Sequence, residues 1–271
     1  MPELPEVETT VRALAARLRG RRILRSERRV DRLREPLPAD LERKVNGRRM
    51  VDFARRAKYI IIHLDQPESL LLHLGMSGRL LFDGPSGGRH EHLTFHCEGG
   101  TVLRFVDPRR FGLLLLARQE ELDRHPRLAG LGIEPLSPAF DGGALWRRLA
   151  GRRCDVKAAL LDQRLVAGIG NIYACEALFR AGISPRRRAG DLGPRRCARL
   201  ARAIVTVLEE AIAAGGSSLR DYVGADGRLG NFQNDFRVYG REGEPCPGCG
   251  RPVRRIVQAG RSTFFCTRCQ R

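Results

Sequence analysis

Lysine is nearly absent from this sequence, and acidic residues are in the minority. Only Lys44, Lys58 and Lys157 are lysines, yet 49 basic residues against 31 acidic ones give a net charge of +18. A genomic preference for arginine codons would explain the use of Arg over Lys, but not the excess of positive charge. That excess indicates a polyanionic partner. Arginine also suits bidentate contacts with phosphates and bases better than lysine does.

The sequence also has no apolar run that approaches the ~20 residues needed to span a membrane. Residues 113–116, four leucines, read as a buried strand at most. The first residues are acidic and polar, unlike a secretory signal, and there is no internal repeat or low-complexity tract. We therefore expect a cytoplasmic chain without membrane contact. In that compartment the eight cysteines would bind metal or stay as free thiols, rather than form disulfides.

Apolar spacing predicts the secondary structure of the first half. Val7, Val11, Leu14 and Leu18 recur at helical spacing, and Gly20 follows as a stop signal. Short apolar runs separated by Gly and Pro then read as strands, at residues 59–62, 69–72, 79–82, 93–95 and 102–105. A Gly-Gly pair at 99–100 suits a hairpin turn between the last two runs. Many strands at short intervals favour an antiparallel sandwich or barrel.

The second half reads as helical. Residues 126–138, rich in Gly and Pro, look like an interdomain connector. Helices are predicted at residues 157–165, 171–181 and 195–214, and a mobile loop at 224–234. We thus expect an α+β, multi-domain fold with an N-terminal antiparallel β-sandwich flanked by the first helix. The predicted divisions are a β-sandwich domain 1–125, a linker 126–138, a helical domain 139–240 and a small C-terminal module 241–271.

Four cysteines near the C-terminus have the spacing of a metal site. Cys246 and Cys249 form one Cys-x2-Cys pair, and Cys266 and Cys269 form another after 16 intervening residues. This pattern is typical of a four-thiolate zinc site, so one structural zinc ion is predicted. A pair of redox dithiols is the alternative. The other cysteines, at 97, 154, 175 and 197, read as packing residues.

The chain start offers a nucleophile. If the initiator Met is removed, Pro2 has a free secondary amine, and an α-amino group titrates near ~8. Such an amine can form an iminium ion with an electrophilic carbon, and Glu3 could move protons beside it. Alone, these two residues could equally begin an ordinary exposed helix.

Two further motifs suggest phosphate contacts. Gly168 and Gly170 allow a tight turn between helices, after which Asn171 would cap the second helix, and helix N-termini bind phosphate readily. Lys58, at the end of an apolar strand, could place one positive charge in a cleft. Each motif also has a purely structural interpretation. The glycine turn could be a capped helical corner that binds no ligand, and Lys58 could be an ordinary surface lysine.

Together these motifs resemble the bacterial formamidopyrimidine-DNA glycosylases, which cut oxidised purines out of DNA. The resemblance spans the whole chain. Its specific parts are residues 1–8 (MPELPEVE), residues 168–174 (GIGNIYA) and the cysteine-rich end. The sister family, endonuclease VIII, opens similarly but typically has Gly where this chain has Leu4. The resemblance implies that residues 1–125 form the catalytic domain and that residues 139–240 form a helix–two-turn–helix DNA-binding domain. Residues 241–271 would be its zinc finger, a zinc-ribbon β-hairpin.

The resemblance implies a role for each matching residue. Pro2 would be the nucleophile and Glu3 its proton carrier, with Glu6 supporting their geometry. Phosphates would be contacted by the set Lys58, Asn171 and Arg261, with Lys58 also lowering the pKa of the Pro2 amine and Arg261 lying in the zinc hairpin.

Further matching residues concern the damaged base, which enzymes of this family flip out of the double helix. The set Met76, Arg109 and Phe111 would fill the gap that the base leaves in the stack, although Met76 and Phe111 read as core residues on sequence alone. One of His90 and His92 would touch the DNA backbone, and the sequence does not choose between them. Residues 217–236 would close over the purine, with Arg220 where many members have Lys.

The predicted function is therefore a bifunctional DNA glycosylase and abasic-site lyase of base excision repair. Its substrate would be double-stranded DNA containing 8-oxoguanine, a formamidopyrimidine or an abasic site. We expect a monomer associated with the nucleoid of a bacterial cytoplasm. Three alternatives stay open: an endonuclease VIII-like enzyme for oxidised pyrimidines, a non-catalytic zinc-ribbon protein that binds nucleic acid, and a proline-amine tautomerase.

Overall fold

A computed structural model describes residues 2–83, 87–218, 224–225, 227 and 229–271. The chain folds into two compact units. The β-unit comprises Met1–Ala129 and Ala214–Asn231, and the helical unit comprises Gly130–Ala213 and Phe232–Arg271. The finer division into four functional parts stays a prediction. No helix among the described residues is long and apolar enough to cross a lipid bilayer.

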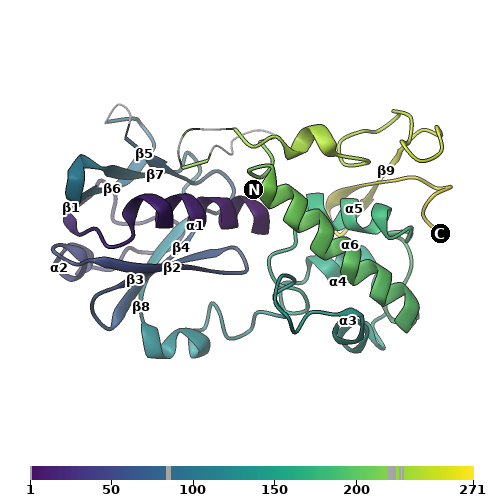
Figure 1. The fold of residues 1–271 in the computed structure, drawn as a ribbon, viewed down its shortest axis with the longest axis horizontal. Helices are drawn as coiled ribbons and strands as arrows, with labels where there is room; N and C mark the ends of the chain where they lie inside the picture. Colours follow the sequence, from purple (N-terminus) through teal and green to yellow (C-terminus); the bar gives the residue numbers. More distant parts are fainter. Residues whose placement is uncertain (1, 84–86, 219–223, 226, 228) are drawn as a thin grey trace. The chain divides into compact units, whose positions relative to one another are not determined.

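Two four-stranded antiparallel sheets form the β-unit (Figure 1). The first has the order β1-β6-β7-β5, with β1 at Ile23–Arg28, β6 at Glu91–Cys97, β7 at Val102–Val106 and β5 at Arg79–Phe82. The second has the order β2-β3-β4-β8, with β2 at Met50–Arg56, β3 at Tyr59–Leu64, β4 at Glu68–His73 and β8 at Leu113–Arg118. The predicted strands and antiparallel sandwich are thus confirmed. Strands β1 and β2 were not predicted, because each lies at a sheet edge and contains several charged residues with neither a continuous apolar run nor a regular alternation.

Helix α1 (Leu4–Leu18) confirms the predicted N-terminal helix. Its apolar stripe, Val7, Val11, Leu14 and Leu18, is buried in one core with residues from both sheets. The side chain of Glu8 accepts a hydrogen bond from the Arg55 guanidinium of β2 at 2.8 Å. Burial opposes the charge of Glu8, yet hydrogen bonds from Arg12 and Arg55 hold its pKa below the ordinary value. Apolar packing and an ion pair therefore fix α1 to the sheet that contains β2.

Short helices complete the β-unit. They are α2 (Leu41–Val45), η1 (Glu98–Gly100) and η2 (Gln119–Arg124). The predicted turn at Gly99 and Gly100 lies in η1 and joins the antiparallel pair β6 and β7. Both glycines have positive φ, at 74° and 72°, a conformation that glycine adopts without steric cost.

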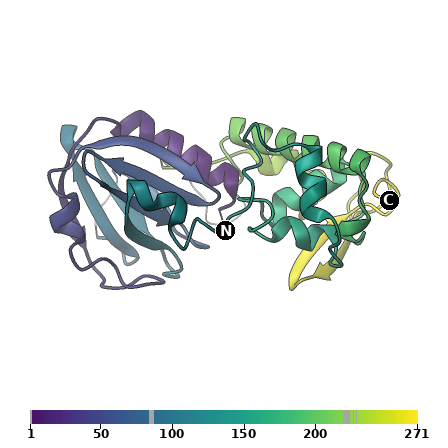
Figure 2. The ribbon, with the colours of Figure 1, turned by 90° about the horizontal axis from the view of Figure 1, so that it is seen from below.

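The helical unit contains four α-helices and one β-hairpin. The helices are α3 (Gly142–Leu149), α4 (Val156–Leu161), α5 (Asn171–Arg180) and α6 (Pro194–Ala213), with short 3-10 turns η3 (Ala189–Asp191) and η4 (Phe232–Asp235). Strands β9 (Arg254–Gln258) and β10 (Arg261–Phe265) pair antiparallel, and they form the yellow hairpin in Figure 2. Helix α3 was not predicted from the sequence.

The predicted helix at residues 157–165 is too long. Helix α4 ends at Leu161, because Asp162 leaves the helix and caps a separate turn. The Asp162 carboxylate accepts hydrogen bonds from the backbone N–H of Arg164 at 3.0 Å and from its guanidinium. A short acidic side chain offers the backbone this alternative to helix.

The loop predicted to close over the base is described only in part. Residues 219–223, 226 and 228 lie outside the described residues, Arg220 among them, as does Met1. The predicted mobility of residues 224–234 therefore stays a prediction.

Candidate active site and zinc centre

The first described residues of the chain, Pro2 and Glu3, are buried, not exposed. Pro2 is buried, and Glu3 is 3% exposed. Glu3 is the N-cap of α1, and a reciprocal capping box joins it to Glu6. The Glu3 side chain accepts from the backbone N–H of Glu6, while the Glu6 Oε2 accepts from the backbone N–H of Glu3 at 2.8 Å. Because both ends of this box are fixed, Pro2 precedes a backbone that is held in one conformation.

Glu6 makes a second connection with its other carboxylate oxygen. Its Oε1 accepts hydrogen bonds from the backbone N–H of Ser217 at 2.9 Å and from the Ser217 hydroxyl at 3.1 Å. Glu6 is 2% exposed, so a buried carboxylate joins the start of the chain to the start of residues 217–236. The sequence suggested a supporting role for Glu6 but not this contact. The Glu-x-x-Glu spacing at the chain start was the only signal that pointed to the capping box.

Lys58 and His73 form a basic pair in the β-unit. Lys58 lies in the two-residue turn between β2 and β3, after Ala57 with a φ of 52°, and it is 7% exposed. Burial, followed by the positive charges of Lys58 and Arg34, lowers the pKa of His73 to about 4. The neutral ring can accept a hydrogen bond, and its Nδ1 does so from the backbone N–H of Gly75 at 2.9 Å.

Met76 and Phe111 are on the surface, so the sequence-based prediction of core positions is wrong for both. They are 41% and 43% exposed and lie in the loops that follow β4 and β7. The guanidinium of Arg109 lies over the Phe111 ring, 4.6 Å from its centroid. Exposed apolar side chains of this kind mark a surface that can contact another molecule.

The structure separates the two candidate histidines. His92 is 2% exposed, and its Nε2 lies 2.8 Å from the carbonyl oxygen of Asp107. His90 is partly exposed. Of the two, only His90 has surface from which a DNA backbone could be touched.

In the helical unit, Asn171 does not cap α5 with its side chain, contrary to the sequence-based expectation. Gly170 is the N-cap, and Asn171 is the first helical residue. The turn before it is held by Gln163, whose Oε1 accepts from Gly168 N–H at 2.8 Å and whose Nε2 donates to the Ile169 carbonyl at 2.8 Å. Sequence reasoning missed this role of Gln163.

Asn171 and Lys157 instead hold the β-hairpin. The carbonyl of Ser262 accepts from Asn171 Nδ2 at 2.9 Å and from Lys157 Nζ at 3.1 Å, and Lys157 also donates to the Thr263 hydroxyl at 2.6 Å. Lys157 is fully buried. These bonds fix the residue next to Arg261, which is exposed beside the Ala259-Gly260 turn. The buried ammonium group of Lys157 therefore interacts with the hairpin and not with solvent.

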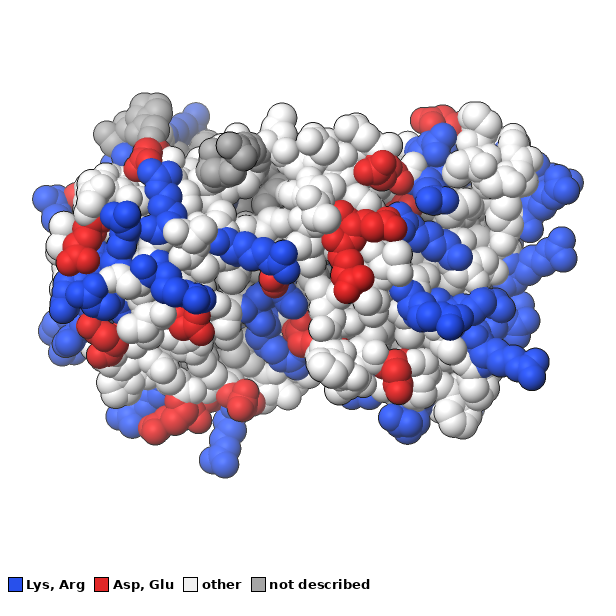
Figure 3. Space-filling view, in the orientation of Figure 1, with Lys and Arg blue, Asp and Glu red and all other residues white. Residues whose placement is uncertain are grey.

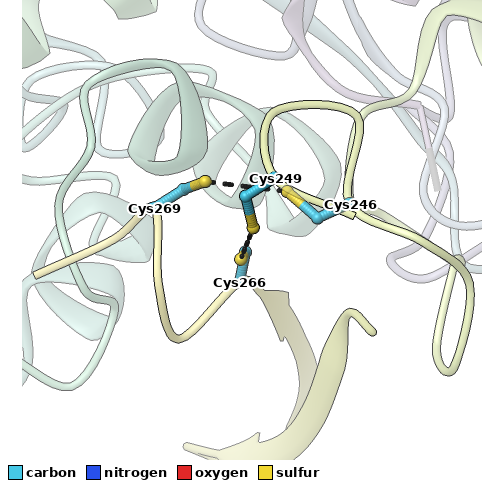
Figure 4. A group of neighbouring side chains, drawn as sticks. All are labelled: Cys246, Cys249, Cys266 and Cys269. Atoms are coloured by element: carbon cyan, nitrogen blue, oxygen red, sulfur yellow. Dashed lines mark hydrogen bonds between the residues drawn. The ribbon is translucent and has the colours of Figure 1, made fainter. Parts of the chain in front are cut away.

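The four cysteines of the predicted metal site converge, as Figure 4 shows. Their sulfurs all lie within 4.8 Å of one another, with Cys246 to Cys269 at 3.8 Å and Cys249 to Cys266 at 3.4 Å. Four sulfurs about 2.3 Å from a tetrahedral zinc are separated by about 3.8 Å. The donor set therefore fits one structural zinc ion, and four protein thiolates leave no position for water.

The protonation of these thiols is coupled. Burial works against ionisation of Cys266, but backbone N–H groups of Cys269 and Arg268 bring its pKa down to about 7. Burial and the neighbouring thiols raise the pKa of Cys269 to about 12. One thiolate is thus accessible near neutral pH, whereas all four require a bound cation.

The remaining cysteines divide in two. Cys97, Cys175 and Cys197 are buried, as expected of packing residues, but Cys154 is exposed, so that expectation is wrong for Cys154. Burial raises the pKa of Cys97 to about 12 and that of Cys197 to about 11. These two thiols are therefore unreactive at neutral pH.

Basic side chains are widespread on the face shown in Figure 3, with acidic ones interspersed. Six of the arginines follow Cys246 in a stretch without a single acidic residue: 251, 254, 255, 261, 268 and 271. One of these arginines makes a hydrogen bond within the hairpin, since the Arg255 Nε donates to Ser262 Oγ at 3.0 Å. Arg261 is exposed in β10 without an ion pair among the described residues.

Three family models match consecutive parts of the chain. Residues 1–114 match the formamidopyrimidine-DNA glycosylase N-terminal domain, and residues 131–223 match the H2TH domain of the same enzymes. Residues 243–271 match the zinc finger found in FPG and IleRS.

Known proteins match along their whole length. Formamidopyrimidine-DNA glycosylases from Cereibacter sphaeroides and Gluconobacter oxydans are 56% and 54% identical, with full coverage of both chains. Among solved structures, the MutM (Fpg) protein of Thermus thermophilus is 45% identical with a TM-score of 0.89, covering 99% of this chain and 98% of that one. A Lactococcus lactis Fpg mutant in complex with DNA containing Fapy-dG is 34% identical with a TM-score of 0.92, and both chains are fully covered. The chain belongs to the formamidopyrimidine-DNA glycosylase family.

Proposed function

We propose that this chain is a DNA glycosylase of base excision repair that removes oxidised purines and then cleaves the strand as an abasic-site lyase. The observation that carries the proposal is the buried start of the chain, where Glu6 holds the backbone of Glu3 at 2.8 Å, directly after Pro2. An exposed, frayed helix start would not position an amine for attack. Preorganised reacting groups lower the barrier by avoiding the entropy cost of alignment.

Pro2 is the nucleophile in this proposal, once Met1 has been removed. Its amine attacks C1′ of the damaged nucleotide, the bond from C1′ to the base breaks, and the base leaves. The opening sugar ring takes a proton from Glu3, and an iminium ion joins C1′ to Pro2. β-Elimination then breaks the bond to the 3′ phosphate, and δ-elimination breaks the bond to the 5′ phosphate, which leaves a one-nucleotide gap.

Three residues provide phosphate contacts in the proposal: Lys58, Asn171 and Arg261. Lys58 is buried beside His73 in the β-unit, so its charge is fixed in place. Asn171 and Arg261 flank the same Ser262 carbonyl in the helical unit. Contacts of this kind position a duplex but do not read its sequence. His90 adds a contact with the DNA backbone, whereas the buried His92 does not.

Met76, Arg109 and Phe111 fill the gap left by the flipped base. Flipping costs a few kcal/mol of stacking and pairing, and exposed apolar side chains with an arginine donor can replace part of it. The exposure of Met76 and Phe111 supports this role. Zinc stabilises the hairpin and takes no part in the chemistry, since all four ligands are thiolates.

Solved relatives support a DNA substrate. Lactococcus lactis Fpg has been crystallised with DNA that contains Fapy-dG, an abasic site or an oxidised pyrimidine. The oxidised-pyrimidine complex keeps the endonuclease VIII-like activity as a second candidate. Leu4, fully buried in α1 where that sister family typically has Gly, favours purines. Because the proposed substrate is chromosomal DNA, we infer that the protein associates with the nucleoid.

The test is strand cleavage of 5′-labelled duplexes with a single lesion. We expect cleavage at 8-oxoguanine opposite cytosine to be at least about tenfold faster than at thymine glycol, which corresponds to about 1.4 kcal/mol. The product ends should carry phosphates on both sides of a one-nucleotide gap. A preference for thymine glycol would support the pyrimidine alternative, and binding without cleavage would support the non-catalytic one.

A further inference from the structure

We propose that Asp107 is a positioning residue that holds Met76, Arg109 and Phe111 together as one preassembled wedge. The inference rests on the proposed function, which assigns these three side chains to the gap left by a flipped base. Asp107 is fully buried at the end of β7, and it does not reach the surface itself.

The Asp107 carboxylate joins two loops that are far apart in sequence. Its Oδ1 accepts from the hydroxyl of Ser77 at 2.7 Å and from the backbone N–H of Arg109 at 3.3 Å. Its Oδ2 accepts from the backbone N–H of Gly112 at 2.7 Å. Ser77 follows Met76 directly, and Arg109 and Gly112 bracket Phe111. One side chain therefore binds the hydroxyl of the residue after Met76, the backbone N–H of Arg109 and the backbone N–H of the residue after Phe111.

The two loops are also in direct backbone contact. Gly75 has a φ of 63°, and a Cβ there would lie 2.4 Å from the carbonyl carbon of Phe111. A Cβ on Gly112 would lie 2.5 Å from the Phe105 ring and 3.1 Å from Asp107 Oδ2. No side chain fits between the loops, so the backbones of Gly75 and Phe111 move together or not at all.

The main chain of Asp107 is bound to strand β6 and to the residue just before it. Its N–H donates to the His90 carbonyl at 2.9 Å, and its carbonyl oxygen lies 2.8 Å from His92 Nε2. The buried ring of His92 cannot reach a phosphate, so its role is the contact with the Asp107 carbonyl oxygen. The carboxylate is thus anchored to a sheet on one side and holds the two loops on the other.

Preassembly matters because the wedge has to enter the stack while the base leaves it. If three side chains had to be ordered separately at that moment, each would add its own entropy cost. The Arg109 guanidinium already lies 4.6 Å from the centre of the Phe111 ring. Asp107 therefore acts on the flipping step, and a substrate that needs no flipping should not depend on it.

The test compares Asp107→Asn and Ser77→Ala with the wild type on two substrates. The first is a duplex with 8-oxoguanine opposite cytosine, in which a base must be flipped. The second is a single-stranded oligonucleotide with one abasic site, which has no orphaned base and reports Pro2 chemistry alone. The asparagine side chain offers only one acceptor oxygen. Either the Gly112 N–H loses its acceptor, or the Ser77 hydroxyl and the Arg109 N–H lose theirs. Ser77→Ala removes a single bond and should have a smaller effect.

Ser69→Ala is the matched control. Ser69 is a fully buried serine of β4 whose hydroxyl lies 2.9 Å from His63 Nδ1, away from the wedge loops. Melting temperatures of all variants are compared with the control. A 2-aminopurine next to the cytosine that faces the lesion reports wedge insertion by its fluorescence, a signal that a loss of stability alone would not change.

We expect Asp107→Asn to slow single-turnover excision from the duplex about 10- to 100-fold. The fluorescence change should slow in parallel, and cleavage of the single-stranded abasic site should stay within about twofold, as for a group remote from the chemistry. Equal losses on both substrates, or no loss on either, would overturn the inference. A wild type that cleaves neither substrate would contradict the proposed function, and the inference would fall with it.

Discussion

The carboxylate of Glu6 in α1 binds Ser217 at a distance of 211 positions along the chain. The same carboxylate holds the backbone N–H of Glu3. One buried side chain therefore sets the position of the proposed nucleophile and of the first residue of the loop at 217–236.

Replacing Glu6 with Gln should destabilise the protein by about 1–3 kcal/mol, because one buried N–H loses its acceptor. The side-chain amide has only one acceptor oxygen, whereas Glu6 accepts with both oxygens. Urea unfolding measures the loss. Glu42→Gln serves as control, since Glu42 is a 30% exposed partner of Arg28 at 3.1 Å. If the two variants unfold at the same urea concentration, Glu6 does not have this anchoring role.

Lys157→Met should weaken DNA binding more than it weakens the fold. Removal of a buried charge offsets part of the lost hydrogen bonding, but the Ser262 carbonyl and the Thr263 hydroxyl lose a donor. The hairpin with Arg261 is then less well fixed. We expect about tenfold lower affinity, since a bond to a charged group contributes about 1.5–3 kcal/mol.

Fluorescence anisotropy with a duplex that contains a stable abasic analogue measures this affinity. Lys44→Met is the control, because Lys44 is a surface lysine paired with Glu68 at 3.0 Å. Unchanged affinity in Lys157→Met, with Arg261→Ala impaired, would show that Lys157 does not position the hairpin.

His73 should make stability fall in mild acid. Burial and nearby cations lower its pKa from 6.5 to about 4, so the folded state prefers the neutral ring. Unfolded chains bind more protons between these two values. The contribution is complete above pH 6.5, is lost as the pH falls toward 4, and changes little below that. Protonation would also break the bond from Gly75 N–H to Nδ1.

The measurement is urea unfolding of the wild type and His73→Gln between pH 7.5 and 4.5, with the difference between the two followed against pH. The wild type should lose more stability than the variant across this range. Parallel curves would mean that His73 titrates near its ordinary value.

Removal of zinc should unfold the hairpin and abolish DNA binding while leaving the β-unit folded. The zinc site lies in a cluster of the helical unit with Cys175, Phe179 and Val238, whereas the core of the β-unit contains none of these residues. Metal analysis should give one zinc per chain, held by the four cysteines. Binding that survives metal removal, or a full complement of zinc in Cys249→Ser, would contradict the assignment.

The sequence predicted best those elements whose apolar residues or cysteines follow a regular pattern. Helix α1 has apolar residues at helical spacing, and the inner strand β4 has a continuous apolar run. The four cysteines have a spacing that few structures other than zinc sites use. Edge strands β1 and β2 were missed, since an exposed edge tolerates charged residues. Helix α3 begins with two glycines, which weaken its helical signal.

The sequence could not show which apolar residues the fold leaves exposed. Met76 and Phe111 are residue types that usually lie in a core, and only the structure shows that they are 41% and 43% exposed. The roles of Asp107 and Gln163 were also invisible, because hydrogen bonds between distant segments leave no periodic pattern. The resemblance to a family supplied the candidates, and the structure supplied the contacts that hold them.

The central claim is that the Pro2 amine is the nucleophile, and borohydride trapping tests it most directly. Wild type and Pro2→Gly, both confirmed by mass spectrometry to lack Met1, are incubated with an abasic-site duplex and sodium borohydride. The account predicts a covalent protein–DNA band for the wild type that is strongly reduced in the variant, because the primary amine of a flexible glycine is not held for attack as the proline amine is. Equal bands would show that the reaction does not need the proline amine, and no band from a zinc-loaded, DNA-binding wild type would contradict the account.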